Sequence, residues 1–225
     1  SNSEGDEIAT VSANTAAGFS IVKYTSGGGD RKVGHGLGVK PDIILQRNRA
    51  ADSWYMYTDL IDGSPDAVNF DMNAAGYATS NHPVPDATEF HHRYSTSAEI
   101  IAYCWASIEG YSKMGIYDGT SLANGPFGYT GFRPAMIISK RVDSTDDWDI
   151  LDNTRNTTND GATCALWPGG AGDTAWEESC HANYAVDFVS NGFKLRGSHA
   201  VLNASGGTYL FMAFAEAPFK YANAR

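Results

Sequence analysis

The sequence predicts an all-β protein: an antiparallel β-sandwich, jelly-roll or lectin-like, with about twelve short strands. Its 225 residues include 24 glycines and 8 prolines, a density of turn formers that favours many short strands over a few long helices. Charged residues make up only 19%, which argues against a helical bundle or a coiled coil. One sequence pattern also occurs twice, so most expected strands have a counterpart elsewhere in the chain.

The repeat is clearest in residues 38–47 and 131–140. Both segments run glycine, apolar residue, basic residue and proline, followed by an apolar triplet that ends near a basic residue. Tyr24 matches Tyr117 on one side, and Trp54 matches Trp148 on the other. Two further matches keep the same order; they join 106–109 with 213–216, and 76–77 with 192–193. We therefore expect two copies of one unit, at 17–109 and 110–217, with the largest insertion of the second copy at 156–182.

Short runs of β-forming residues between turn signals define the expected strands. In the first copy they lie at 19–24, 43–47, 54–58, 68–71, 77–79 and within 97–109. In the second copy they lie at 113–117, 136–140, 148–151, 185–189, 193–195 and 208–214. The segment 97–109 alone fits a buried helix or a buried strand, but its aromatic-rich partner 208–214 follows a Ser-Gly-Gly turn and favours a strand for both.

The domain organisation follows from how each copy covers its apolar face. Half a sandwich cannot bury that face, whereas two units packed face to face can. This argument predicts a single β-sandwich domain over residues 17–225, made of both repeats plus a C-terminal tail. Two separate small sandwiches joined near Gly110 are the alternative. The polar, acidic start of the chain has no secretory-signal pattern, and residues 1–16 are expected to form a linker.

The charge balance narrows the choice of partners. The chain has 16 basic and 26 acidic residues, a formal net charge of −10 and a pI near 4.9. Such a surface repels phosphate backbones and anionic lipids, so neither nucleic acid nor a membrane surface is an expected partner. No apolar run approaches the roughly 20 residues that a membrane helix requires.

The three cysteines do not form a metal-ligand pattern. Cys104 lies in the apolar run 100–106 and is expected to be a buried, inert thiol. Cys164 and Cys180 could form a local disulfide if the protein works outside a reducing cytosol; otherwise they are ordinary loop thiols.

An acidic cluster supplies the candidate metal ligands. Calcium prefers six to eight oxygen ligands from a flexible loop, and residues 143–147 form such a loop between two expected strands. The candidate ligands are Asp143, Asp146 and Asp147, with Asp149 and Asp152 close behind. A solvated turn is the alternative, because the first copy carries only one acid at this place. No other cofactor is expected.

A second metal hypothesis concerns His91 and His92 with Glu89. Adjacent residues of a strand point to opposite faces, so both histidines reach one ion only if the segment is irregular. A solvated loop is the alternative. No phosphate-binding loop, nucleophile elbow or zinc-binding helix motif is present, and no enzymatic activity is expected.

Tryptophans provide the candidate ligand site. Trp54 and Trp148 are equivalent in the repeat, which favours a structural role in the core. Trp167 and Trp176 lie in the inserted stretch, where the repeat does not explain them. Exposed indoles stack on the apolar faces of sugar rings while neighbouring acids bind the hydroxyls. The expected ligand-binding residues are Trp167, Trp176, Asp173, Glu177 and Glu178.

Five segments are specific in combination: 34–42, 109–113, 129–134, 191–196 and 211–225. Together they resemble a module of uncharacterised function that closes long structural proteins of bacteriophages, especially marine ones. The resemblance runs from about residue 11 to residue 225. It implies a virion component, such as part of a tail fibre, in an extracellular particle assembled in the host cytoplasm. It also implies other virion subunits as partners and, by analogy with tail fibres, a homotrimer. It supplies no catalytic residues.

Residues and resemblance together predict non-catalytic recognition of a glycan or receptor on the host surface. A structural module that decorates the virion or drives its oligomerisation without a ligand is the main alternative. A hydrolase that degrades capsule polysaccharide through paired carboxylates is a third interpretation.

Overall fold

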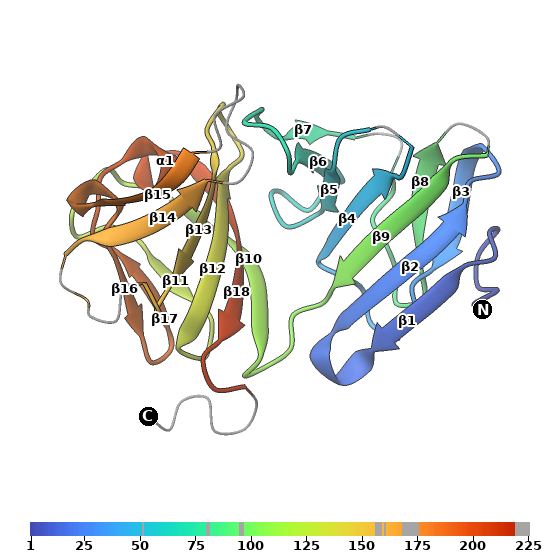
Figure 1. Ribbon diagram of the computed structural model, residues 1–225, viewed down its shortest axis with the longest axis horizontal. Helices are drawn as coiled ribbons and strands as arrows, with labels where there is room; N and C mark the ends of the chain where they lie inside the picture. Colours follow the sequence, from blue (N-terminus) through green and yellow to red (C-terminus); the bar gives the residue numbers. More distant parts are fainter. Residues whose placement is uncertain are drawn as a thin grey trace. The chain divides into compact units, whose positions relative to one another are not determined.

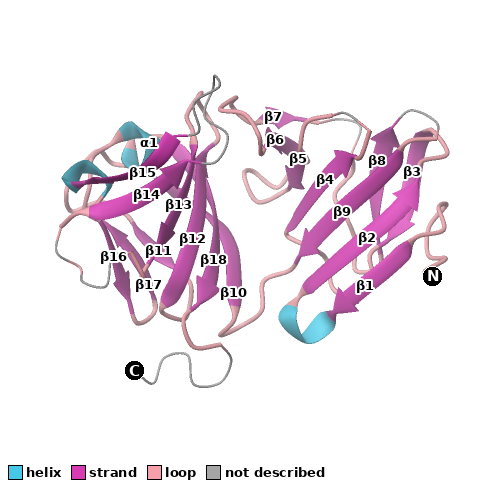
Figure 2. Cartoon of the chain, in the orientation of Figure 1, coloured by secondary structure: helices cyan, strands magenta, loops and turns pink. Residues whose placement is uncertain are grey.

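The computed structural model describes residues 1–50, 52–79, 82–94, 97–155, 159, 161–167 and 176–218, and at 93–94 and 176–179 it describes the backbone only. The described chain is dominated by strands, with one four-residue α-helix and two short 3-10 helices (Figure 2). The strands pair antiparallel, which confirms the all-β antiparallel fold. The chain divides into two compact units: unit 1 (residues 1–70 and 76–108) and unit 2 (residues 71–75 and 109–225).

Unit 1 consists of one wide sheet and one narrow sheet (Figure 1). The wide sheet has the order β1-β2-β9-β4-β5-β6-β7, and β3 pairs with β8 in the narrow one. The bounds are β1 Thr10–Asn14, β2 Phe19–Thr25, β3 Gly29–Gly34, β4 Ile43–Asn48, β5 Tyr55–Thr58, β6 Asp66–Asn69, β7 Tyr77–Ala78, β8 Glu89–Tyr94 and β9 Glu99–Trp105. A 3-10 turn, η1 (Thr15–Ala17), joins β1 to β2.

The core of unit 1 lies between its two sheets. Val22, Ile44 and Ile100 come from the wide sheet, and Val33 and Phe90 come from the narrow one. All five are at most 3% exposed. The alternation of buried and exposed residues along β2 and β9 is the pattern of a sheet with one face on a core.

Unit 2 repeats this plan. Its wide sheet has the order β10-β18-β12-β13-β14-β15, and its narrow sheet has the order β11-β17-β16. The bounds are β10 Ser112–Asp118, β11 Phe127–Tyr129, β12 Pro134–Arg141, β13 Trp148–Asp152, β14 Thr163–Trp167, β15 Trp176–His181, β16 Val186–Val189, β17 Gly192–Leu195 and β18 Thr208–Ala215, with η2 Ala182–Tyr184 and α1 Ala200–Asn203.

The core of unit 2 joins Ile137 and Leu151 of the wide sheet to Phe193 of the narrow sheet and to Leu202 of α1. Phe193 also explains a glycine on the neighbouring strand. Gly128 lies opposite Phe193 in the β11–β17 ladder, and a Cβ atom at that position would clash with the Phe193 ring.

The two units share one topology. The run β2-β9-β4-β5-β6 in unit 1 corresponds to β10-β18-β12-β13-β14 in unit 2, and the β3–β8 pair corresponds to β11–β17. Trp148 is 1% exposed, as expected for a core residue. Trp54 is only partly buried; it stacks on Tyr103, and the guanidinium of Arg47 lies 5.4 Å from its ring centroid.

Strand register corrects one of the sequence matches. Tyr24 pairs with Ile100, and its counterpart Tyr117 pairs with Tyr209. Ala106 therefore corresponds to Ala215, two positions beyond the match of 106–109 with 213–216. The two alignments are hard to separate in the sequence, because a shift of two residues leaves every side chain on the same face of a strand.

The match of 76–77 with 192–193 is wrong as well. Tyr77 lies in β7, which pairs with β6 in the wide sheet of unit 1. Phe193 lies in β17, which pairs with β11 and β16 in the narrow sheet of unit 2. A glycine followed by an aromatic residue is too common at strand starts to establish equivalence.

Residues 156–182 are not only an insertion. β14 lies in this stretch and takes the place that β6 takes in unit 1, and β15 follows it as a further strand. Neither strand was predicted, because the glycine-rich residues between them dominate the local composition.

Residues 1–16 are not a linker. β1 pairs with β2 along its whole length, and Ala9 is 1% exposed. Bridges join Asn2 to Ala9, and both Gly5 and Glu7 to Val33. The segment looks like a linker in the sequence because β1 is an edge strand whose side chains are mostly exposed, and such strands carry polar residues.

Each unit encloses a core of its own. In each unit, core residues of the wide sheet pack against core residues of the narrow sheet. The structure therefore favours the alternative of two small sandwiches over one sandwich spanning residues 17–225.

Cys104 is the buried thiol that the sequence predicts, and the structure decides between the two states left open for Cys164 and Cys180. Cys104 is completely buried, and burial raises the pKa of its thiol to about 12. Cys164 and Cys180 form a disulfide between paired positions of β14 and β15.

Removing this disulfide by the double substitution Cys164→Ser and Cys180→Ser is expected to destabilise unit 2 by about 3 kcal/mol, the typical effect for a loop of this length. Urea unfolding followed by hydrogen exchange would measure each unit separately. Cys104→Ser in unit 1 is the matched control and should leave the protection of unit 2 unchanged. Equal losses of protection in both units from the double variant would contradict the assignment.

Candidate binding site

Unit 2 contains a cavity of about 190 Å³. It is lined by Asp146, Asp147, Trp167, Tyr184, His199 and Val201. Trp167 ends β14, Tyr184 ends η2, His199 caps α1, and the two aspartates belong to the turn before β13. The volume is below the roughly 300–1,000 Å³ of pockets for drug-sized ligands, so it suits one sugar-sized group.

Three rings form one wall of the cavity. The ring centroids of Trp167 and Tyr184 are 5.3 Å apart, and those of Tyr184 and His199 are 4.6 Å apart. Both pairs meet edge to face, at 73° and 61°, which is a favourable geometry for aromatic rings. Burial raises the pKa of Tyr184 and lowers that of His199. The wall is therefore largely apolar and uncharged.

A buried carboxyl group fixes the indole of Trp167. The pairing of Ile150 with Leu166 places Asp149 and Trp167 at the next cross-strand position, and Trp167 Nε1 donates a hydrogen bond to Asp149 Oδ1 at 2.5 Å. Asp149 is completely buried, and burial raises the pKa of its carboxyl group well above the ordinary value. Its Oδ2 atom has no hydrogen-bond partner among the described residues. Asp149 does not line the cavity, so its role is to position Trp167.

Two basic residues, Arg141 and Lys140, form hydrogen bonds to the acidic turn. Arg141 pairs with both oxygens of Asp143, at 3.0 and 3.1 Å, and with Asp146 Oδ2 at 3.3 Å. Lys140 is completely buried and donates to the backbone carbonyls of Asn73, Arg141 and Asp146. Burial lowers the pKa of Lys140 to about 8. Asp147 differs from its neighbours, because its buried Oδ1 atom has no partner among the described residues.

The predicted ligand residues are only partly accounted for. Trp167 lines the cavity as expected, and the backbone of Trp176 pairs with it across the β14–β15 ladder. The side chains of Trp176, Glu177 and Glu178 lie outside the described residues, and so does Asp173.

Two of the predicted calcium ligands, Asp143 and Asp146, pair with Arg141. Asp143 also accepts a hydrogen bond from the Thr208 backbone, and Asp152 caps the 153–155 turn and pairs with Arg155. Within the described part of the chain, no group of three or more histidine, cysteine, aspartate or glutamate side chains is placed to hold a metal ion. Calcium binding by Asp143, Asp146 and Asp147 stays a prediction.

The histidine pair lies in a regular strand, β8, so its two side chains point to opposite faces. His91 Nδ1 lies 3.1 Å from Asp30 Oδ1. His92 is completely buried against the ring of Tyr24, and burial lowers its pKa to about 4. These positions do not bring the two histidines to one ion.

Sequence reasoning missed Tyr184, His199 and the positioning role of Asp149. Asp149 carried a usable signal, since a charged residue at the start of an apolar strand in a repeat is unusual. Tyr184 and His199 carried none, because they come from short helices that only the tertiary fold brings to β14.

The family comparison adds one finding. A family described as a domain of unknown function, DUF7483, matches residues 1–218. The chain belongs to this family. Its description states no activity, ligand or origin, so the resemblance to phage virion modules remains a prediction. Searches of the curated proteins and of the solved structures find no match. The match begins at residue 1, which agrees with the packing of residues 1–16 in unit 1.

None of the helices in the described residues is long and apolar enough to cross a membrane.

The buried carboxyl predicts a specific pH dependence. In the folded protein the pKa of Asp149 lies above its unfolded value near 3.8. Protonated Asp149 therefore contributes to the free energy of unfolding at low pH, and this contribution is lost as the pH rises above about 4. Relative to Asp149→Asn, the wild type should lose about 1.4 kcal/mol for each unit of difference between the folded and unfolded pKa. Urea unfolding at a series of pH values measures this.

Asp143→Asn is the matched control with the opposite sign. The hydrogen bond from Arg141 lowers the pKa of Asp143, so its contribution is present above pH 4 and is lost on acidification. Parallel pH profiles of the wild type and Asp149→Asn would show that Asp149 ionises normally in the folded protein.

Proposed function

We propose that the chain is a non-catalytic module of a phage virion protein that recognises a glycan on the host surface. The observation that carries this proposal is the unit 2 cavity, which is lined by Trp167 together with the acidic residues Asp146 and Asp147. A sugar ring offers an apolar face for the indole and hydroxyl groups for the acids.

The hydrogen bond from Trp167 to Asp149 supports the proposal further. It restricts rotation of the indole before any ligand arrives, and a preorganised group loses less entropy on binding. The placement in a virion is supported by the resemblance of 34–42, 109–113, 129–134, 191–196 and 211–225 to phage modules. A homotrimer with other virion subunits as partners is part of the same proposal.

Binding fits the cavity better than hydrolysis. Glycoside hydrolysis uses two carboxyl groups, one of them with a raised pKa. The one carboxyl here whose pKa burial raises well above its ordinary value, Asp149, does not line the cavity. Asp146 does line it, but pairs with Arg141.

The substitution Trp167→Ala is expected to weaken glycan binding about tenfold or more, because it removes a stacking interaction worth about 1–1.5 kcal/mol together with buried area. Binding to an array of immobilised sugars, followed by titration calorimetry with the best sugar, would measure the loss. Trp167→Phe keeps a ring but removes the bond to Asp149, and should give a smaller loss.

Tyr129→Ala is the matched control. Tyr129 is an aromatic residue of unit 2 that is 64% exposed and does not line the cavity, so its removal should leave binding unchanged. If the wild type binds no sugar and forms a stable trimer in solution, the structural alternative replaces glycan recognition. New reducing ends released from a bound polysaccharide would instead establish a hydrolase.

A further inference from the structure

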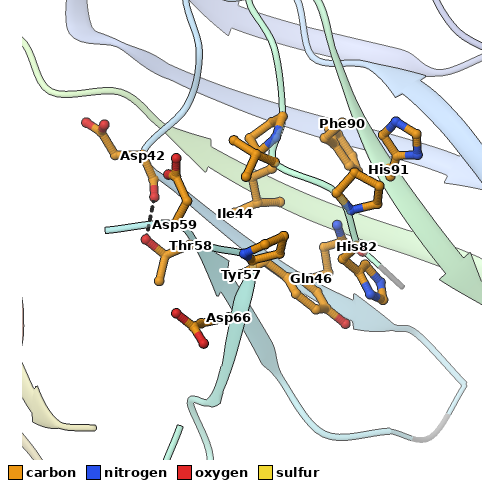
Figure 3. Close-up of a pocket in the computed structure, with 14 residues that line it drawn as sticks. Asp42, Ile44, Gln46, Tyr57, Thr58, Asp59, Asp66, His82, Phe90 and His91 are labelled. Carbon is orange, nitrogen blue, oxygen red and sulfur yellow. Dashed lines mark hydrogen bonds between the residues drawn. The ribbon is translucent and has the colours of Figure 1, made fainter. Parts of the chain in front are cut away.

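A second pocket lies in unit 1 and was not expected from the sequence (Figure 3). It occupies the face of the wide sheet that carries Ile44, next to Phe90 and His91 of β8. Pro83 and Pro85 of the segment before β8 also line it. The two pockets are not copies of each other. The unit 1 pocket lies at the start of β4, and the unit 2 cavity lies beyond the end of the corresponding strand, β12.

Gln46 is the unusual residue of this pocket. Its side chain lines the pocket and is 1% exposed, yet neither Oε1 nor Nε2 has a hydrogen-bond partner among the described residues. A buried amide whose donor and acceptor are both unpaired is unfavourable, and native proteins rarely keep one without a reason. Figure 3 shows Gln46 beside the ring of Tyr57 and close to His82. Those two rings stack with centroids 4.1 Å apart and form one wall.

Two carboxyl oxygens add further acceptors. Asp59 Oδ1 and Asp66 Oδ2 are buried and have no partner among the described residues. The other oxygen of Asp59 pairs with Lys40 at 2.5 Å. Gln46, Asp59 and Asp66 therefore line the pocket together with the apolar residues Ile44 and Phe90.

The shape of the pocket limits what can enter. Its volume is about 20 Å³, which is too small for a whole sugar ring. An acetamido group has a matching composition. Its N–H and C=O complement the C=O and N–H₂ of a glutamine side chain, and its methyl group fits against apolar residues.

We propose that the pocket around Gln46 binds the acetamido group of an N-acetylated sugar. Gln46 pairs with the amide of that group. This inference deepens the proposed glycan recognition and rests on it for the kind of molecule that carries the group. It adds a second contact point, in the other unit of the chain.

The test is an NMR titration of the full ¹⁵N-labelled chain with N-acetylglucosamine and, separately, with glucose, which lacks the acetamido group. The side-chain N–H₂ signals of Gln46 should shift with N-acetylglucosamine only, and N-acetylglucosamine should bind at least tenfold more tightly than glucose. Gln46→Met keeps the length of the side chain and removes both polar atoms, so it should abolish this preference. Tyr129→Ala in unit 2, an exposed aromatic residue that lines neither pocket, is the control and should retain it.

The outcomes separate the two sites. Equal binding of the two sugars, or a preference that survives in Gln46→Met, would overturn the assignment of the unit 1 pocket. If Gln46→Met does not fold, the Gln46 signals of the wild type decide: their failure to move with N-acetylglucosamine overturns the proposal. If sugar binding depends on Trp167 and the Gln46 signals do not move, only the unit 2 site is retained. If the Gln46 signals shift and Trp167→Ala has no effect on sugar binding, only the unit 1 pocket is retained as a sugar site.

Discussion

In each unit, one sheet is much wider than the sheet that packs against it. In unit 1 a seven-stranded sheet faces a two-stranded one, and in unit 2 a six-stranded sheet faces a three-stranded one. A narrow sheet cannot cover the whole apolar face of a wide one, so turns and short helices cover the rest. Both pockets lie where turns or short helices cover the wide sheet. In unit 1 the covering segment includes Pro83 and Pro85, and in unit 2 it includes η2 and α1.

Polar residues break the apolar pattern of the inner faces at equivalent places. Gln46 pairs with Tyr55 in unit 1, and Ser139 pairs with Asp149 in unit 2; these two cross-strand pairs occupy the same position of the shared topology. Burying an amide or a carboxyl group without full hydrogen bonding destabilises a fold. Natural sequences break such rules mostly at functional sites. In this protein one exception lines a pocket, and the other orients the indole that lines a cavity.

Several residues of the unit 2 cavity stood out in the sequence, but nothing there indicated that they belong to one site. Trp167 stood out because the repeat does not explain it, and Asp146 and Asp147 stood out as an acidic turn. They were assigned to two different hypotheses, a sugar site and a calcium site. Their closeness depends on the β13–β14 pairing, and a single sequence does not reveal which strands become neighbours. Gln46 was overlooked because one polar residue in an apolar strand reads as an ordinary interruption.

Sequence patterns alone predicted the antiparallel strands and the recurrence of one unit. Alternation along a strand is a pattern of neighbouring residues. The recurrence of 38–47 as 131–140 can be read by comparing the two segments directly. Packing in three dimensions places residues 1–16 in unit 1, closes each unit over its own core, and brings polar residues to two pockets. Those outcomes depend on contacts between residues far apart in the chain, where packing and hydrogen bonding select among arrangements that the local pattern permits equally well.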